Sequence, residues 1–129
     1  MSVELNELLG KVLVKIENQN DELIFHCENG EKYKLYHSQD CCESVTIEDI
    51  NGDLEDLIGA PILLAEEVTS EENPEGVTKE YQDSFTWTFY KLATIKGYVD
   101  IRWYGESNGY YSESVSFAKA DENGEFSYW

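Results

Sequence analysis

Alternation of apolar and polar side chains with a period of two restricts the fold of this chain more than any other feature of its sequence. It runs through residues 11–17, 22–28, 32–37, 84–95, 97–105 and 110–120. Because successive side chains of a strand point to opposite faces, each run predicts a β-strand with one buried face. A content of 41% apolar residues, with 9 Tyr, 5 Phe and 3 Trp, argues against a disordered chain.

Each run assigns its apolar residues to one face of its strand. The predicted sets are Val12, Val14 and Ile16; Leu23, Phe25 and Cys27; Tyr33 and Leu35; Phe85, Trp87 and Phe89; Val99, Ile101 and Trp103; and Tyr111, Val115 and Phe117. The set in 110–120 also contains Glu113, which must meet water, a cation or a hydroxyl on that face, or mark a functional pocket.

The turn after the second strand fixes how the second and third strands pair. A two-residue turn at Asn29-Gly30 would place Phe25 opposite Lys34 and mix the faces. A three-residue loop over residues 28–30 pairs Phe25 with Tyr33 and Leu23 with Leu35. The pattern therefore predicts a type I turn with a bulge and a left-handed Gly30.

The remaining segments complete an α+β prediction. Residues 3–9 and 54–58 predict two short helices, the second capped by Asp53. Further strands are expected at 44–47 and 62–68, an acidic loop at 69–82, and a tail at 120–129 that either frays or docks Phe126 and Trp129 on the sheet. The prediction is one domain over residues 1–129, with about six or seven strands in antiparallel-rich meanders.

The negative charge of the chain is concentrated in its middle. The formal net charge is −18, from 27 acidic and 9 basic residues, and residues 35–78 contain 12 acids and no Lys or Arg. This balance argues against direct binding to nucleic acid or to an anionic membrane, since both require clustered cations. Without an apolar run of about 20 residues or a cationic N-terminal leader, we expect a cytoplasmic protein.

Acids of this middle region are the predicted contact residues for a partner with a basic surface. Carboxylates on a rigid scaffold can imitate phosphate charge and steer association, although a solubilising role explains the same composition. The predicted partner-binding residues are Glu48, Asp49, Asp53, Glu55, Asp56, Glu66 and Glu67.

A second candidate site is the cluster from His37 to Glu43. It contains His37, Asp40, Cys41, Cys42 and Glu43, residue types that bind metals or supply a thiol and a base. A zinc site normally needs a second ligand pair, and adjacent cysteines are poor disulfide partners. The alternative is that Cys41 and Cys42 fill small spaces in the core.

Other local patterns predict no chemistry of their own. Residues 49–53 start like a calcium loop, but Leu54 and Ala60 stand where an EF-hand has Gly and Glu. Arg102, the only arginine, shares a face with Asp100 and is expected to pair with that acid or with one on a neighbouring strand. Neither a nucleophile triad nor a phosphate-binding glycine loop is recognisable, so no cofactor is predicted and an enzyme is disfavoured.

Several short segments of the sequence resemble those of a family of small, uncharacterised acidic domains from bacteriophages and prophage-bearing bacteria. They are Tyr36–Glu43, Gly52–Leu54, Trp87–Lys91, Trp103–Gly105 and Asn108–Ser112, within a similarity over about residues 10–118. The resemblance implies a phage setting and transfers no activity or catalytic residue.

Three functions follow as hypotheses. The first is a binding or inhibitor protein that engages a basic surface of a host protein, with a nucleic-acid mimic as one form of it. The second is a small metal- or thiol-dependent protein centred on residues 37–43. The third is a virion or scaffold component that self-associates through its β-domain.

Overall fold

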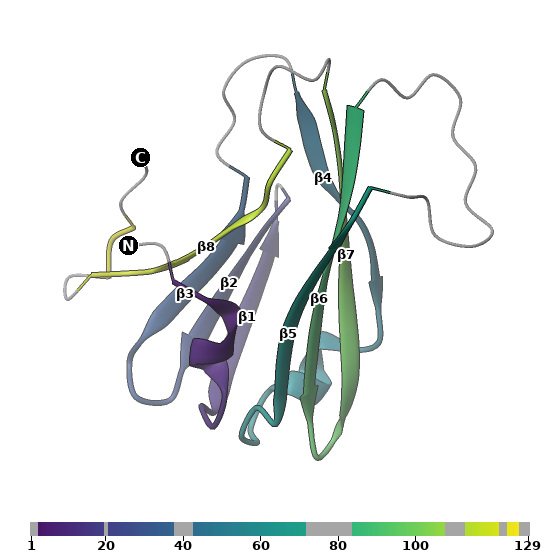
Figure 1. Cartoon of the computed structure of the whole chain (residues 1–129). Coiled ribbons are helices and arrows are strands. Elements are labelled where there is room, and N and C mark those ends of the chain that lie inside the picture. The colour runs from purple at the N-terminus through teal and green to yellow at the C-terminus, as the bar shows by residue number, and fades with distance from the viewer. Residues whose placement is uncertain are drawn as a thin grey trace.

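The protein is built from two four-stranded antiparallel sheets that face each other, as the computed structural model shows (Figure 1). The structure describes residues 3–19, 21–37, 43–71, 84–107, 113–121 and 124–126. The elements are η1 (Leu5–Leu8), β1 (Leu13–Gln19), β2 (Glu22–Cys27), β3 (Lys32–Tyr36), β4 (Ser44–Asn51), η2 (Leu54–Leu57), β5 (Leu64–Ser70), β6 (Ser84–Thr94), β7 (Gly97–Ser107) and β8 (Ser116–Lys119).

Strand order shows how the chain moves between the layers. The first sheet has the order β1-β2-β3-β8 and the second the order β4-β7-β6-β5. The chain therefore completes three strands of the first sheet, builds the whole second sheet, and returns with β8 to pair antiparallel with β3. Backbone bridges Leu9–Ile62, Val12–Pro61 and Leu13–Ile58 join the two layers at the end where η1 and η2 lie (Figure 1).

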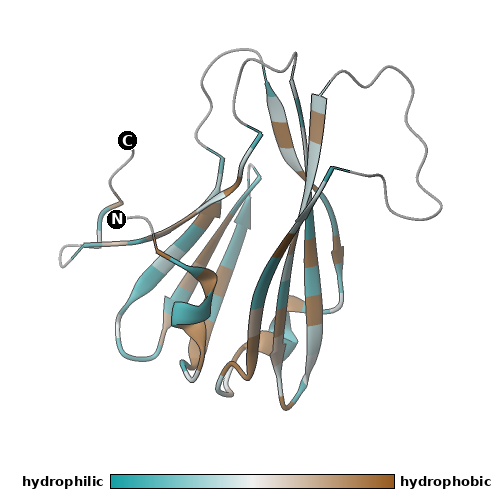
Figure 2. Ribbon diagram, viewed as in Figure 1, coloured by the Kyte–Doolittle hydropathy of each residue, from teal (hydrophilic) through white to brown (hydrophobic). Residues whose placement is uncertain are grey.

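One hydrophobic core fills the space between the sheets. Leu23, Phe25 and Leu35 from the first sheet belong to the same buried cluster as Leu92 and Ile101 from the second. Brown and teal bands alternate along several strands in Figure 2, as expected of strands with one buried face. No helix in the part of the chain that the structure describes is both long and apolar enough to cross a membrane.

The antiparallel prediction is confirmed, but the α+β class is wrong because both expected helices are single 3₁₀ turns. Each comprises four residues, so the fold is essentially all-β. So short a segment cannot repay the cost of nucleating an α-helix. Asp53 does cap the second turn, since its Oδ1 accepts from the Glu55 N–H at 3.0 Å.

The predicted β2–β3 hairpin is confirmed in register and in turn conformation. Phe25 pairs with Tyr33 and Leu23 with Leu35. Gly30 has a φ of 92°, in the left-handed region that favours glycine. Burial of one apolar face and a glycine in the turn thus decide this register together.

A β-bulge makes the predicted face of β1 wrong. The register with β2 shifts between Leu13 and Lys15, so Leu13 is fully buried while Val14 is 54% exposed. Ile16 is inward again, opposite Phe25. The extra residue changes which side chains point inward, and simple alternation does not anticipate it.

The aromatic stripe Phe85, Trp87 and Phe89 shares one face as predicted, but this is the outer face of the second sheet. Trp87 is paired with Tyr104, and their ring centroids are 4.6 Å apart. The Arg102 guanidinium lies 5.3 Å from the Trp87 ring centroid, which suits a cation–π contact. The opposite face of β6 carries Tyr90 and Leu92 into the core.

Two predicted loop regions lie partly outside the described residues. Of the acidic loop 69–82, residues 69–71 are described, and β5 extends to Ser70. In the tail, Phe126 lies beside Lys34 on β3, whose ammonium is 5.5 Å from the ring centroid, so this residue docks as one alternative predicted. Trp129 and the Tyr111 end of the last predicted strand fall outside the described residues.

Candidate functional site

The predicted acids of β4 lie on an edge strand of the second sheet. Glu48 and Asp49 are exposed, and Glu48 occupies a β-bulge opposite β7. Asp49 Oδ2 is 3.9 Å from the Arg102 guanidinium, so the expected pairing of the only arginine with an acid on a neighbouring strand is observed. Asp49 Oδ1 also accepts from the Ile50 N–H at 2.9 Å.

Three further predicted acids lie in and before η2, at the end of the same edge strand. Asp53 and Glu55 are exposed, and Asp56 is half-buried. The Asp56 carbonyl accepts a hydrogen bond from the Thr94 hydroxyl, which ties η2 to β6. Together with Glu48 and Asp49, these residues form what we term the acidic edge.

Glu66 and Glu67 do not belong to that edge, because β5 is the opposite edge strand of the sheet. Glu66 pairs with Lys91 across the outer face. Glu67 points to the inner face, where its Oε1 accepts from the Tyr90 hydroxyl at 2.8 Å. The predicted seven-residue surface is thus divided between two edges and two faces.

His37 and Glu43 meet across the intervening chain, as the candidate metal or thiol cluster requires. His37 Nε2 is 2.8 Å from Glu43 Oε2, and His37 Nδ1 is 2.7 Å from the Ser114 carbonyl. The carbonyl only accepts, so Nδ1 carries a proton. Both ring nitrogens are therefore engaged with protein oxygens, an arrangement that leaves neither free to bind a metal.

The rest of that cluster lies outside the described residues. Asp40, Cys41 and Cys42 are among the residues that the structure does not describe. Within the described ranges, no group of three or more His, Cys, Asp or Glu side chains is placed to hold a metal ion. Cys27 is buried, and burial raises the pKa of its thiol, which disfavours the reactive thiolate.

Glu113 lies in a cavity of about 300 Å³ between β5, β6 and the segment that precedes β8. Its Oε1 accepts from the Thr86 hydroxyl at 2.8 Å and its Oε2 from the Ser107 hydroxyl at 2.5 Å. Ser84 donates a further side-chain hydrogen bond. Of the alternatives for Glu113, hydroxyl partners are the ones observed.

These hydroxyls determine the charge of Glu113. Burial alone would raise the pKa of the carboxyl, but the hydrogen bonds from Ser107, Ser84 and Thr86 outweigh it and lower the pKa. On the other side of the cavity, burial and the nearby Glu67 raise the pKa of Tyr90, which keeps its hydroxyl protonated as a donor. The lowered pKa keeps Glu113 ionised at neutral pH, and Glu67, an exposed residue, lines the same cavity.

Gly105 lets the Glu113 segment approach the second sheet. A Cβ at this position would lie 2.8 Å from the Glu113 carbonyl oxygen and 3.0 Å from its Cβ. Gly105 pairs with Val45 on one side and with Thr86 on the other. The absence of a side chain here thus positions Glu113 beside the hydroxyls that bind it.

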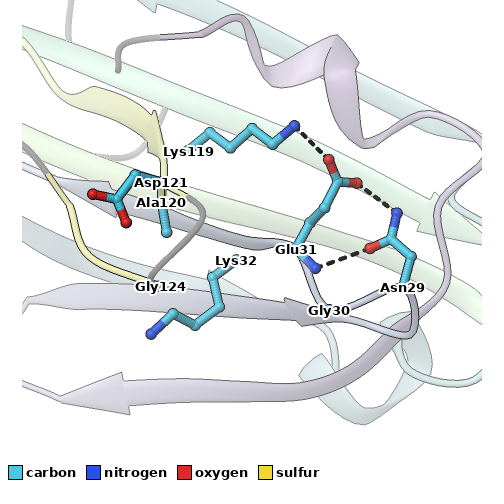
Figure 3. Close-up of a pocket in the computed structure, with 8 residues that line it drawn as sticks. All are labelled: Asn29, Gly30, Glu31, Lys32, Lys119, Ala120, Asp121 and Gly124. Atoms are coloured by element: carbon cyan, nitrogen blue, oxygen red, sulfur yellow. Dashed lines mark hydrogen bonds and ion pairs between the residues drawn. The ribbon is translucent and has the colours of Figure 1, made fainter.

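A separate ion-pair cluster joins the edges of the first sheet (Figure 3). Glu31 Oε1 accepts from Lys11 at 2.5 Å and from Asn29 at 2.6 Å, and Oε2 accepts from Lys119. Hydrogen bonds from Lys11, Lys119 and Asn29 lower the pKa of Glu31 to about 2. The cavity beside it, about 330 Å³, separates the β2–β3 turn from the chain after β8.

Sequence reasoning singled out Glu67 and Glu113 for separate reasons and did not bring them together. The signal that could have joined them is the second alternation in β6, where Ser84, Thr86 and Thr88 occupy the face opposite the aromatic stripe. Hydroxyls on an inward face need polar partners, and only the tertiary fold supplies Glu113.

Fold and site together define a small two-sheet β-domain with an acidic edge and a carboxylate-containing cavity. Residues 6–117 match the family described as "Domain of unknown function (DUF7448)", and the chain belongs to that family. No curated protein and no solved structure matches the chain.

Proposed function

We propose that this protein is a non-enzymatic binding domain that engages a basic surface of another protein through its acidic edge. The observation that supports the proposal is the exposure of Glu48, Asp49, Asp53 and Glu55 along one edge strand and the turn that follows it. No lysine or arginine interrupts residues 35–78, so the segment carrying this edge has one sign of charge.

The edge is suited to contacts through side chains more than to added β-strands. A bulge at Glu48 and hydrogen bonds from the Ile47 and Ile50 N–H groups to Asp21 and Asp49 occupy part of the backbone edge. Bulges and charged side chains are devices by which edge strands avoid pairing with other chains. Carboxylates held this way increase association rates with a cationic surface and discriminate against anionic ones.

The proposed setting is a bacteriophage or prophage, with a host protein in the bacterial cytoplasm as the partner. This part of the proposal depends on the resemblance described for the sequence. A domain of this kind would act as a nucleic-acid mimic, occupying a groove that normally binds phosphates. The metal- or thiol-dependent alternative is weakened by the engagement of both His37 nitrogens.

The test compares two doubly charge-reversed variants. Glu48→Lys/Glu55→Lys changes the acidic edge, whereas Glu4→Lys/Glu28→Lys changes two exposed acids outside the second sheet by the same total charge. Each protein is immobilised and exposed to bacterial lysate, captured proteins are identified by mass spectrometry, and the dissociation constant is measured for each identified partner with and without competing duplex DNA.

We expect the edge variant to lose the partner, the control to retain it, and DNA to compete with it. Equal binding by both variants, or equal loss in both, would contradict a located acidic site. Light scattering on the same samples addresses self-association: a concentration-dependent dimer that the edge variant abolishes would favour the scaffold alternative.

A further inference from the structure

The free side of β5 differs from the other three sheet edges of the domain (Figure 1). Bulges interrupt the register of β1 and of β4, and β8 is only four residues long. Bulges and short strands are devices that keep a sheet edge from pairing with other chains. In contrast, β5 pairs with β6 from Leu64 to Ser70 without any shift in register, so its other side is a regular strand edge.

The chain itself places backbone along this edge just before β5 begins. The Leu63 N–H donates to the Ala93 carbonyl of β6 at 2.8 Å. On its other side, Ile62 exchanges two hydrogen bonds with the N-terminal segment. Its carbonyl accepts from the Gly10 N–H at 2.8 Å, and its N–H donates to the Lys11 carbonyl at 2.9 Å. Backbone pairing on the side away from β6 is therefore already part of the fold, up to Ile62.

Beyond that point the edge is exposed over four consecutive residues. Ala65 is buried, whereas Glu66, Glu67, Val68 and Thr69 are all exposed. Among the described strands, β6 is the one that pairs with β5. Alternate N–H and C=O groups of an edge strand point away from its neighbour, so this stretch presents main-chain donors and acceptors to a further strand.

The side chains of this stretch disfavour a second copy of the chain as that further strand. Glu67 is the middle residue of the seven in β5, so in a full-length antiparallel pair of two β5 strands it would lie opposite its own counterpart. Like charges directly opposite one another destabilise a strand pair, and each copy carries a net charge of −18. The same carboxylates favour a strand that brings cations.

We propose that β5 binds an extended segment of another protein by strand addition, and that this segment has two consecutive basic residues opposite Glu66 and Glu67. Glu66 lies opposite Lys91 on the outer face of the sheet. Glu67 lies on the inner face, where it accepts from Tyr90. Side chains of the added strand alternate in the same way, so two adjacent lysines or arginines place one cation on each face.

Main-chain hydrogen bonds give such a complex its affinity, and the side chains give it specificity. The exposed Val68 favours an apolar, β-branched residue opposite it, next to the two cations. The inference does not depend on the acidic edge, because β4 and β5 are opposite edges of the second sheet.

The test titrates the full chain with the peptide acetyl-Thr-Val-Lys-Lys-Val-Thr-amide. Two N-methylated forms of the peptide have alternate amides blocked, one set on each edge of the peptide strand, at unchanged charge. Binding is followed by ¹H–¹⁵N NMR shifts and by hydrogen exchange of the β5 amides. Glu66→Gln/Glu67→Gln removes both carboxylates, and Glu48→Gln/Glu55→Gln removes equal charge from the acidic edge as the matched control.

We expect saturable shifts in β5 and β6, together with slower exchange at alternate β5 amides, which backbone pairing produces. One N-methylated peptide should bind at least about tenfold more weakly and the other within about twofold of the parent, because one edge of the added strand meets β5. Glu66→Gln/Glu67→Gln should weaken binding several-fold, as for two exposed charge pairs. The control should leave the dissociation constant within about twofold.

Four results would overturn the proposal. Equal binding by the two N-methylated peptides, or equal weakening by the two double variants, would indicate only the general attraction of a basic peptide to an acidic protein. The absence of saturable shifts up to about 10 mM peptide, above the range of a weak specific site, would exclude the added strand. A dimer of the chain alone with protected β5 amides would make a second copy the occupant.

Discussion

His37 and Glu43 form a buried hydrogen-bonded pair, with 2.8 Å between Nε2 and Oε2 and with side chains that are 5% and 0% exposed. The chain contains a second pair of the same type, His26 and Glu17, whose nitrogen and oxygen are 2.7 Å apart but whose side chains are 27% and 34% exposed. The two pairs share their chemistry and differ mainly in burial.

Replacing the histidine of the buried pair should therefore destabilise the protein far more than replacing the histidine of the exposed pair. We expect His37→Ala to lower the free energy of unfolding by about 3 kcal/mol, because the fully buried Glu43 side chain loses a hydrogen-bond partner that water cannot replace. His26→Ala should cost less than about 1 kcal/mol, as for other exposed pairs. Urea unfolding of both variants checks this, and equal losses would contradict the role assigned to burial.

Glu31 should make stability depend on pH in the acid range. Its pKa of about 2 in the folded protein lies below the ordinary 4.5, so its contribution is complete above about pH 4.5 and is lost as the pH falls toward 2. Glu31→Gln should flatten the fall in unfolding free energy over this interval. Glu28→Gln, in the same turn, is the control, and 0.5 M salt should reduce the difference between wild type and Glu31→Gln.

The charge of Glu113 should depend on its hydroxyl partners. Thr86→Val/Ser107→Ala removes two hydrogen bonds that lower the pKa of Glu113 and leaves burial, which raises it. The pKa should therefore rise, as followed by ¹³C NMR of the side-chain carboxyl. Thr69→Val changes another residue that lines the cavity, and an equal rise in that control would contradict the assignment.

Gly105→Ala should displace the Glu113 segment from the second sheet. The new Cβ would lie 2.8 Å from the Glu113 carbonyl oxygen, so either the backbone moves or the contact is lost. A destabilisation of about 1–3 kcal/mol is expected from overpacking. The Thr86 and Ser107 resonances should shift at the same time; an unchanged spectrum with normal stability would show that the close approach is unimportant.

Local patterns predicted the hairpins well because their determinants are close in sequence. The Leu23–Leu35 pairing depends on a single turn glycine and two apolar faces. The bulge after Leu13 was not predicted, because it depends on how β1 must meet β2 and the η2–β5 connection. The two helices were misassigned because four residues with a cap and an apolar spacing fit a 3₁₀ turn equally well.

The candidate site was predicted only in fragments. The seven acids were selected from the charge pattern alone, which does not indicate that alternation along β5 sends Glu66 and Glu67 to opposite faces. Glu113 was recognised as unusual, whereas its partners Thr86 and Ser107 come from other strands and only the tertiary fold brings them near. Polar contacts of this kind join residues that are far apart in the sequence, so no local pattern predicts them.

The pairing of β3 with β8 bears on the order in which the protein is synthesised. Tyr33 and Leu35 receive their neighbours Lys119 and Phe117 only after the whole second sheet has been made. Until then the free side of β3 is an unpaired strand edge flanked by apolar residues, a structure prone to association with other chains. Nascent or truncated chains that end before residue 116 should therefore be the most aggregation-prone forms of this protein, and they identify where chaperones would be needed.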